Sequence, residues 1–453
     1  MSIFSRLTDI LHPRKPTPPV AESGFMPDVK FKVVVIDFQD NVESTGGENT
    51  ARILQNLRDF EVSFFDEPFN KTFLNLESRT IFDLIDKGQA LLERTGADVL
   101  VWGCRENDKI RLNFQTEKQY EKDDGAFVSL LDSLYLPAEL LNHPDNFPSA
   151  VKTLLHGAII SAISPADNRI RIHRRYLLKR DIQELSKDNS AKQLAVNYMP
   201  YIMNFLGIIY LSYAFDAEDT RDYKITSMLF ATAIKHQDLI DSPLHLGCIY
   251  YHLGQLNDCA GIYQNRRLGH YFKDAVNNYR QAQRYLGKYT YPYDYGYISY
   301  KLSHLFFYYW KQKEDIQALR DAVSQLREVE KIFSYSQFPE FWAAIQGELG
   351  YLLSILGNIT QSVEICRLAI NSYHNQQKVV TEKREPLVWA STQENIGNIH
   401  YKIGTEHNSR DHLEDALECF HDALYVYENI SKTDKIKQML TAIARTDNEL
   451  KIM

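Results

Sequence analysis

The chain of 453 residues has little proline, glycine or cysteine, with 15 Pro, 20 Gly and 5 Cys. Collagen-like and low-complexity chains need far more Pro and Gly, so the composition excludes both classes. The cysteines are odd in number, scattered and without a CxxC pair: Cys104, Cys248, Cys259, Cys366 and Cys419. This pattern favours small buried thiols in a reducing compartment over a disulfide framework, and it argues against a zinc site.

Positive charge and long apolar runs are also scarce. The formal net charge is −8, and a chain of this sign lacks the basic footprint of a general nucleic-acid binder. The longest apolar run, residues 199–215, is short for a membrane span. The N-terminus has no continuous apolar segment of the kind a secretory signal needs. We therefore expect a cytoplasmic protein.

Aromatic residues are abundant, with 28 Tyr and 23 Phe, and 44% of the chain is hydrophobic. Such a chain can bury a large core of helices packed through amphipathic rings. Apolar residues of segment 1–11 recur at helical spacing, and a Pro-rich linker follows over 12–20. The predicted tail, residues 1–30, is either frayed or a short amphipathic helix that touches a partner or, weakly, the inner membrane surface.

The first third predicts an α/β domain over residues 31–122. Strands are expected at 31–38, 60–65, 98–103 and 109–116, and helices at 48–58 and 78–95. The order predicts a small, partly parallel sheet that carries helices. The loop 45–50 is an ordinary turn or a phosphate cradle at a helix start, although no P-loop lysine follows it. Asp37, Asp40 and Glu43 near the first strand are either solvated or capping groups, or catalytic acids.

A helical junction is expected over residues 123–190. His156 lies inside its predicted helix 148–163, where a lone histidine is usually structural. The basic cluster at 169–180 is a solvated helix that pairs with acidic neighbours, or a patch for an anionic partner or RNA. The residues predicted to form this basic patch are Arg171, Arg174, Arg175, Lys179 and Arg180.

Residues 191–453 contain five units, each predicted to form a pair of helices, A and B. In each unit a small residue on helix A is followed by a small, a large and a small residue on helix B. The anchors are Gly207, Gly247, Ser303, Gly350 and Gly397, spaced by 40, 56, 47 and 47 residues. The first helix-B residue follows 19 residues after the anchor in units one, three and five. It follows after 28 residues in unit two and after 12 in unit four, where Ser362, Cys366 and Ala369 form the set. Small residues let two helices approach closely, so this recurrence predicts stacked helix pairs.

These units resemble the tetratricopeptide repeat (TPR) family. Segment 386–398, PLVWASTQENIGN, is similar to repeats of bacterial proteins that read P-L-x-W-A-x-T-Q-x-N-L-G-N. The helix-ending proline is mostly missing, and Ser303 and Cys366 depart from the family pattern. The first 120 residues, with VVVIDF and GADVLVWG, are similar to N-terminal domains of bacterial repeat proteins without an assigned activity. The resemblance implies a mainly α fold: a TPR-like α-solenoid of about five helix pairs, with a C-terminal capping helix at 434–450, preceded by the small α/β domain.

In TPR proteins the inner faces of the A helices line a concave groove, and the resemblance carries that role to twelve residues here. They are Tyr201, Asn204, Tyr251, His252, Tyr297, Tyr300, His304, Tyr308, Glu394, Asn398, Tyr401 and Lys402. Tyrosine is enriched at interfaces, but the same rings could instead fill gaps between repeats. Asn398 and Lys402 lie one turn apart and could hold a peptide carboxylate.

The chain contains no HExxH, G-x-S-x-G or Walker motif. We therefore expect a non-enzymatic adaptor or scaffold that binds a protein or peptide partner in the groove, without a cofactor or metal. One alternative is an α/β domain that senses a nucleotide or small anion, with the repeats as recruiting arm. Another is a peripheral membrane scaffold anchored through residues 1–11. Homo-oligomerisation stays open.

Overall fold

A computed structural model describes residues 29–38, 46–66, 78–106, 108–116, 131–165, 168–187, 198–218, 222–240, 242–263 and 268–453. Over these residues the protein is mainly helical, with one small sheet near the N-terminus. The predicted tail helix 1–11 and its linker lie outside the described residues. The chain divides into two compact units, an N-terminal unit, Ser23–Ile298, and a C-terminal unit that contains Ser299–Met453.

The sheet of the N-terminal unit has the strand order β2-β1-β3-β4-β5. Its strands are β1 (Phe31–Ile36), β2 (Phe60–Phe65), β3 (Val99–Glu106), β4 (Lys109–Gln115) and β5 (Ser133–Pro137). β1 pairs in parallel with both β2 and β3, whereas β4 pairs antiparallel with β3 and β5. The partly parallel sheet and its four predicted strands are thus confirmed. The prediction that residues 123–190 form a helical junction is wrong for part of this range, because strand β5 lies within it.

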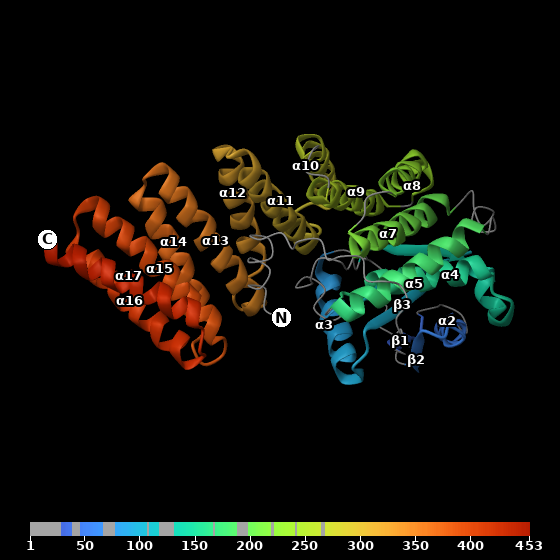
Figure 1. Cartoon of the computed structure of the whole chain (residues 1–453). Coiled ribbons are helices and arrows are strands. Elements are labelled where there is room, and N and C mark those ends of the chain that lie inside the picture. Colours follow the sequence, from blue (N-terminus) through green and yellow to red (C-terminus); the bar gives the residue numbers. More distant parts are fainter. Residues whose placement is uncertain are drawn as a thin grey trace. The chain divides into compact units, whose positions relative to one another are not determined.

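Helices cover this sheet and continue into the first helix pairs (Figure 1). They are α2 (Gly46–Gln55), α3 (Ser78–Thr95), α4 (Ser149–Ala162), α5 (Asn168–Lys187), α7 (Met199–Ala217), α8 (Tyr223–Lys235), α9 (Pro243–Tyr263) and α10 (Leu268–Tyr285). α2 packs on β1 to β3, α4 on β4 and α7 on β5. One continuous apolar core extends from Phe31 in β1 to Leu256 in α9. The sheet and the first helix pairs therefore share a core across both predicted boundaries, 122 and 190.

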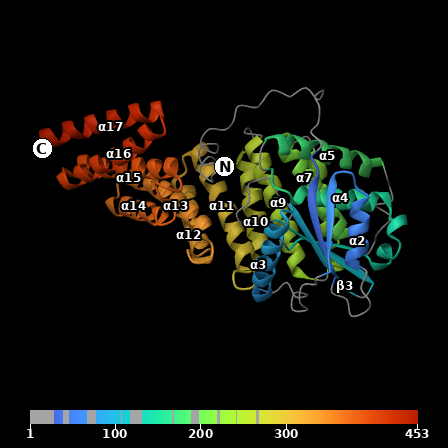
Figure 2. The ribbon, with the colours of Figure 1, turned by 90° about the horizontal axis from the view of Figure 1, so that it is seen from below.

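The C-terminal unit is built from helices alone among its described residues. The helix α11 (Pro292–Lys313) enters it at Ser299, followed by α12 (Ile316–Ile332), α13 (Pro339–Thr360), α14 (Val363–Gln377), α15 (Pro386–His407), α16 (Arg410–Asn429) and α17 (Thr433–Ile452). Each of α13 and α15 packs most extensively on the helix that follows it. Helices α12 to α17 follow one another in space as in sequence (Figure 2). α17 packs on α16 and α15, in the position of the predicted terminal helix.

The boundaries of the first helix of each pair recur regularly. α9, α11, α13 and α15 start at Pro243, Pro292, Pro339 and Pro386, where proline fits because its missing N–H needs no intrahelical partner. α7, α11, α13 and α15 are followed by left-handed residues at Glu218, Glu314, Gln361 and Asn408, a common way to end a helix. The last three of these are 47 residues apart in turn. Proline thus marks the start of four of these first helices.

Glycines sit where the two helices of a pair touch. A Cβ atom on Gly207 would lie 2.5 Å from Phe230, one on Gly350 2.8 Å from Tyr373, and one on Gly397 2.7 Å from Phe420. In all three pairs the ring follows the glycine by 23 residues. Helix α14 therefore presents Tyr373 to Gly350, which corrects the predicted unit-four set that began at Ser362.

Unit two also needs a correction, because its ring Tyr279 faces Gly254 and not the predicted anchor Gly247. A Cβ atom on Gly254 would lie 2.4 Å from Tyr279, whereas one on Gly247 would meet Leu286. Two glycines seven residues apart lie on one helix face, so sequence spacing alone could not choose between them. With Gly254 as anchor, the five anchors follow at nearly constant steps of 47, 49, 47 and 47 residues.

Substitution of Gly350 by alanine should destabilise the protein by about 1–2 kcal/mol, because overpacking against Tyr373 outweighs the gain in helix propensity. Gly269 in α10 is the matched control, since a Cβ atom there would meet nothing within 4 Å. Gly269→Ala should be neutral or stabilising. Denaturant unfolding of both variants measures this, and equal effects would contradict the close helix crossing.

No helix among the described residues is both long and apolar enough to cross a membrane. The apolar run 199–215 forms most of α7, which supplies Tyr201, Phe205 and Ile208 to the core. Its hydrophobicity is thus explained by burial within the N-terminal unit.

Candidate binding site

Four predicted groove residues of the N-terminal unit, Tyr201, Asn204, Tyr251 and His252, are buried. His252 Nε2 lies 3.0 Å from Asp132 Oδ2, and Asn204 Nδ2 donates to Asp132 Oδ1 at 3.2 Å. His252 Nδ1 also lies 2.9 Å from Gln255 Oε1. These side chains form an internal polar network, so they do not line an open groove as predicted. Asp132, from the segment before β5, could not be placed beside α7 and α9 from the sequence.

Tyr297 is the fifth predicted groove residue of this unit. It is half-buried on α11, with its ring centroid 6.4 Å from that of Tyr251. Its position beside a buried ring fits the alternative in which the tyrosines fill gaps between helices.

The predicted basic patch on α5 is divided, because Arg174 and Arg171 pair with acidic groups of the unit whereas its other members keep part of their surface accessible. Arg174 has a side-chain exposure of 0% and lies 3.5 Å from Asp216 of α7. Arg171 contacts Asp216 and Glu218 at 3.8 and 3.1 Å. Arg175 and Lys179 are half-buried. The helix does pair with acidic neighbours, one of the two alternatives that the sequence predicts, while Arg169 is exposed and the Arg180 side chain is 37% exposed.

Arg180, the last member of the patch, belongs to a buried cluster around His156. His156 Nδ1 lies 2.6 Å from Asp181 Oδ2, and its Nε2 lies 3.3 Å from Asp59 Oδ2, which also accepts from Arg180 at 2.9 Å. Burial alone would lower the pKa of His156, but hydrogen bonds to Asp181 and Asp59 raise it above its ordinary value. The imidazole also stacks on Phe60, with ring centroids 4.8 Å apart. These contacts join α4, α5 and β2, as expected of a structural histidine.

The start of α2 contains the described part of the predicted phosphate loop. Gly46 and Gly47 approach Phe38 and Asp37 so closely that a Cβ atom on either would lie 2.6 Å from them. The amide of Phe38 donates to the Asp37 carboxylate at 2.9 Å, so this carboxylate bonds to the adjacent backbone. Asp40, Glu43 and Thr45 lie outside the described residues.

In the C-terminal unit, predicted groove residues of α11 meet a carboxylate from α13. Tyr300 Oη donates to Glu348 Oε1 at 2.7 Å, and His304 Nε2 lies 3.0 Å from Glu348 Oε2. Glu348 is nearly buried, whereas the His304 side chain is 25% exposed. Tyr308, one turn further along α11, is half-buried. Helices α11 and α13 are thus joined through Glu348, and the His304 side of this contact is accessible.

The predicted groove residues of α15 lie beneath cations of the last helix. Lys435 Nζ contacts Glu394 at 2.9 Å, and Arg445 donates to Asn398 Oδ1 at 3.0 Å. The Arg445 guanidinium also lies 4.2 Å from the Tyr401 ring centroid. Lys402 Nζ donates to the Asn358 carbonyl of α13 at 3.1 Å. Three cations, Lys435, Arg445 and Lys402, therefore follow this face of α15.

Sequence reasoning missed Lys435, Arg445 and Glu348. The sequence predicts both cations to lie in a polar capping helix, and only the fold shows that Lys435 and Arg445 reach α15. Glu348 is a carboxylate within an otherwise apolar stretch of α13, and a buried acid usually has a partner. That signal was available in the sequence.

Neither a protein-family model nor a curated protein sequence matches this chain.

Proposed function

We propose that the protein is a non-enzymatic scaffold whose C-terminal unit binds a protein segment through the face of α15 that carries Glu394, Asn398, Tyr401 and Lys402. The occupant is a peptide that presents a carboxylate, from an acidic side chain or its own C-terminus. The supporting observation is Arg445, which is exposed and stacked on Tyr401. Arginine has five N–H donors, and among the described residues Arg445 donates one hydrogen bond, to Asn398.

The architecture proposed for this function is a TPR-like solenoid. Its support is the repeated helix pair, with small anchors 47 to 49 residues apart and, in four of the five pairs, a ring set against the glycine 23 or 25 residues later. In such arrays the first helices of successive pairs share one face. The contacts from α11 to α13 and from α13 to α15 fit that order. A step of 47 residues exceeds the usual TPR period of about 34, and the long first helices account for much of the difference.

Lys402 lies one turn along α15 from Asn398, and its ammonium donates to the Asn358 carbonyl and lies 3.6 Å from Glu406 Oε1. In the proposed complex the peptide carboxylate shares this second cation with Glu406. A carboxylate bridged by guanidinium and ammonium groups forms charge-assisted hydrogen bonds, which contribute about 1.5–3 kcal/mol each. The Tyr401 ring beneath Arg445 holds the guanidinium plane in place. This combination selects a carboxylate.

The test is selection from a displayed peptide library on the immobilised full chain. The wild type should enrich peptides with acidic residues or a free C-terminal carboxylate, and binding should weaken with added salt. The double variant Arg445→Ala, Lys402→Ala should bind the selected peptides at least about tenfold more weakly, since it loses charge-assisted contacts.

Arg410→Ala is the matched control, because Arg410 is an exposed arginine of α16 that pairs with Glu414. It should leave peptide affinity unchanged. Tyr300→Ala is a poorer probe, since the side chain is nearly buried and its loss would unpair Glu348. Selected peptides that lack carboxylates, or that bind the double variant as well as the wild type, would contradict the proposal.

A further inference from the structure

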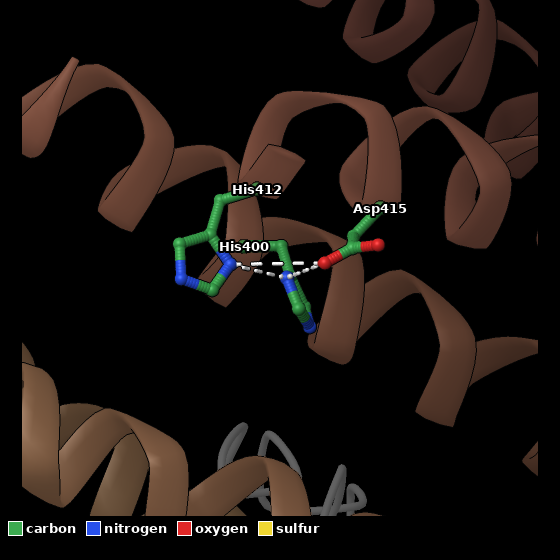
Figure 3. A group of neighbouring side chains, drawn as sticks. All are labelled: His400, His412 and Asp415. Atoms are coloured by element: carbon green, nitrogen blue, oxygen red, sulfur yellow. Dashed lines mark hydrogen bonds and ion pairs between the residues drawn. The ribbon is translucent and has the colours of Figure 1, made fainter. Parts of the chain in front are cut away.

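Two histidines and an aspartate converge where α15 turns into α16, on residues that the scaffold function does not use. His400 lies near the end of α15, and His412 and Asp415 lie in the first turns of α16. Asn408, in the left-handed conformation, and Ser409 reverse the chain between these helices. The three side chains point toward one another from the two helices (Figure 3).

The distances within this group are those of a metal-ligand set. His400 Nδ1 lies 3.0 Å from His412 Nδ1 and 3.2 Å from Asp415 Oδ2, and His412 Nδ1 lies 3.7 Å from the same oxygen. Tetrahedral zinc with bonds of about 2.0–2.1 Å places neighbouring ligand atoms about 3.3 Å apart. A single ion above this triangle could therefore reach all three atoms with only small side-chain adjustments.

Hydrogen bonding alone satisfies this triangle poorly. A neutral imidazole has one N–H, and an ionised carboxylate only accepts. His400 Nδ1 lies within 3.2 Å of both His412 Nδ1 and Asp415 Oδ2, it has at most one proton to donate, and two ring nitrogens that face each other can share only one proton. A divalent cation would use a lone pair of each ligand atom at once.

The surroundings fit a site with one open position. The exposed fraction of the side chain rises from 13% for His400 to 22% for His412 and 52% for Asp415. The histidines are thus held between the helices, while the aspartate side faces solvent and leaves room for water as a fourth ligand. Mixed imidazole and carboxylate ligands suit zinc and similar divalent transition metals.

We propose that His400, His412 and Asp415 bind one divalent transition-metal ion of the zinc type, which fastens α15 to α16 at their shared turn. The scattered cysteines argue only against a thiolate site, and this ligand set uses none of them. The histidines are separated by 11 intervening residues across a helix turn, a spacing that does not match the short ligand pairs of zinc fingers. Only the fold brings them together.

Titration of the metal-free full chain with Zn²⁺ against a chromogenic chelator tests this site. His412→Gln should bind one equivalent less than the wild type, or bind it more than about tenfold more weakly, because even second-shell changes cost about 10–100-fold in affinity. Co²⁺ should give the visible absorption of a tetrahedral site in the wild type and not in His412→Gln. Far-UV circular dichroism without metal confirms that both proteins are folded.

His421→Gln is the control, since His421 is an exposed histidine of the same helix outside the cluster. It should bind Zn²⁺ and Co²⁺ as the wild type does. Equal binding by wild type and His412→Gln would overturn the proposal. So would a wild type that binds no Zn²⁺, in which case the three side chains only share protons.

Discussion

Replacement of Asp132 by alanine should lower the free energy of unfolding by about 3–5 kcal/mol, because it removes one partner of a fully buried polar pair. His252 has a side-chain exposure of 0%, as does Asp132. The substitution leaves His252 Nε2 and Asn204 Nδ2 without the carboxylate oxygens that they contact. Urea unfolding followed by circular dichroism measures the loss.

Asp145→Ala is the control for this prediction. Asp145 pairs with Arg52, but their side chains are 70% and 57% exposed, and exposed pairs contribute at most about 1 kcal/mol. Asp132→Asn keeps one acceptor oxygen and should recover part of the loss. If Asp132→Ala and Asp145→Ala were equally stable, the buried network would not support the N-terminal unit.

The second large effect is expected at Arg174, where substitution by methionine should also cost about 3–5 kcal/mol. The change leaves Asp216 buried with Arg171 as its nearest remaining cation, 3.8 Å away. Replacement of both partners, Arg174→Met with Asp216→Leu, should restore most of the stability, since apolar residues of similar volume often replace a buried ion pair at no cost. A double variant no more stable than Arg174→Met alone would contradict this account.

The same pair predicts how stability depends on pH. Burial raises the pKa of Asp216 from 3.8 to about 6, and the nearby Arg174 and Arg171 only partly oppose that rise. Because the folded pKa exceeds the unfolded one, this carboxyl group favours folding most at low pH, and that contribution is lost as the pH rises through about 6. Between pH 3.8 and neutrality this carboxyl group lowers the free energy of unfolding as the pH rises, and in Asp216→Asn that fall should disappear.

Much of the fold followed from local patterns. β-branched runs indicated the parallel strands β1 and β3, and the spacing of Gly397, Ala416 and Phe420 indicated a correct helix pair. Errors arose where a pattern had two solutions. Gly247 and Gly254 lie on the same face of α9, and only the position of Tyr279 selects the second.

The site was less predictable, because long-range partners decide whether a polar side chain is accessible. Arg174, in a helix that the sequence predicts to be solvated, is buried beside Asp216, 42 residues further along the chain. His252, a predicted groove residue, contacts Asp132, which is 120 residues away in sequence. On α15 the predicted residues keep accessible neighbours, but the cations above them come from a helix whose expected role was only to close the array.

The continuous core of the N-terminal unit has a consequence for how the protein unfolds. Phe31 of the sheet and Leu256 of α9 belong to one apolar cluster, so the sheet and the first helix pairs should melt in a single cooperative step. Among the described residues of the C-terminal unit, most helices pack on their sequence neighbours, and such arrays lose stability repeat by repeat from an end. The same chain thus combines an all-or-none half with a half that can fray.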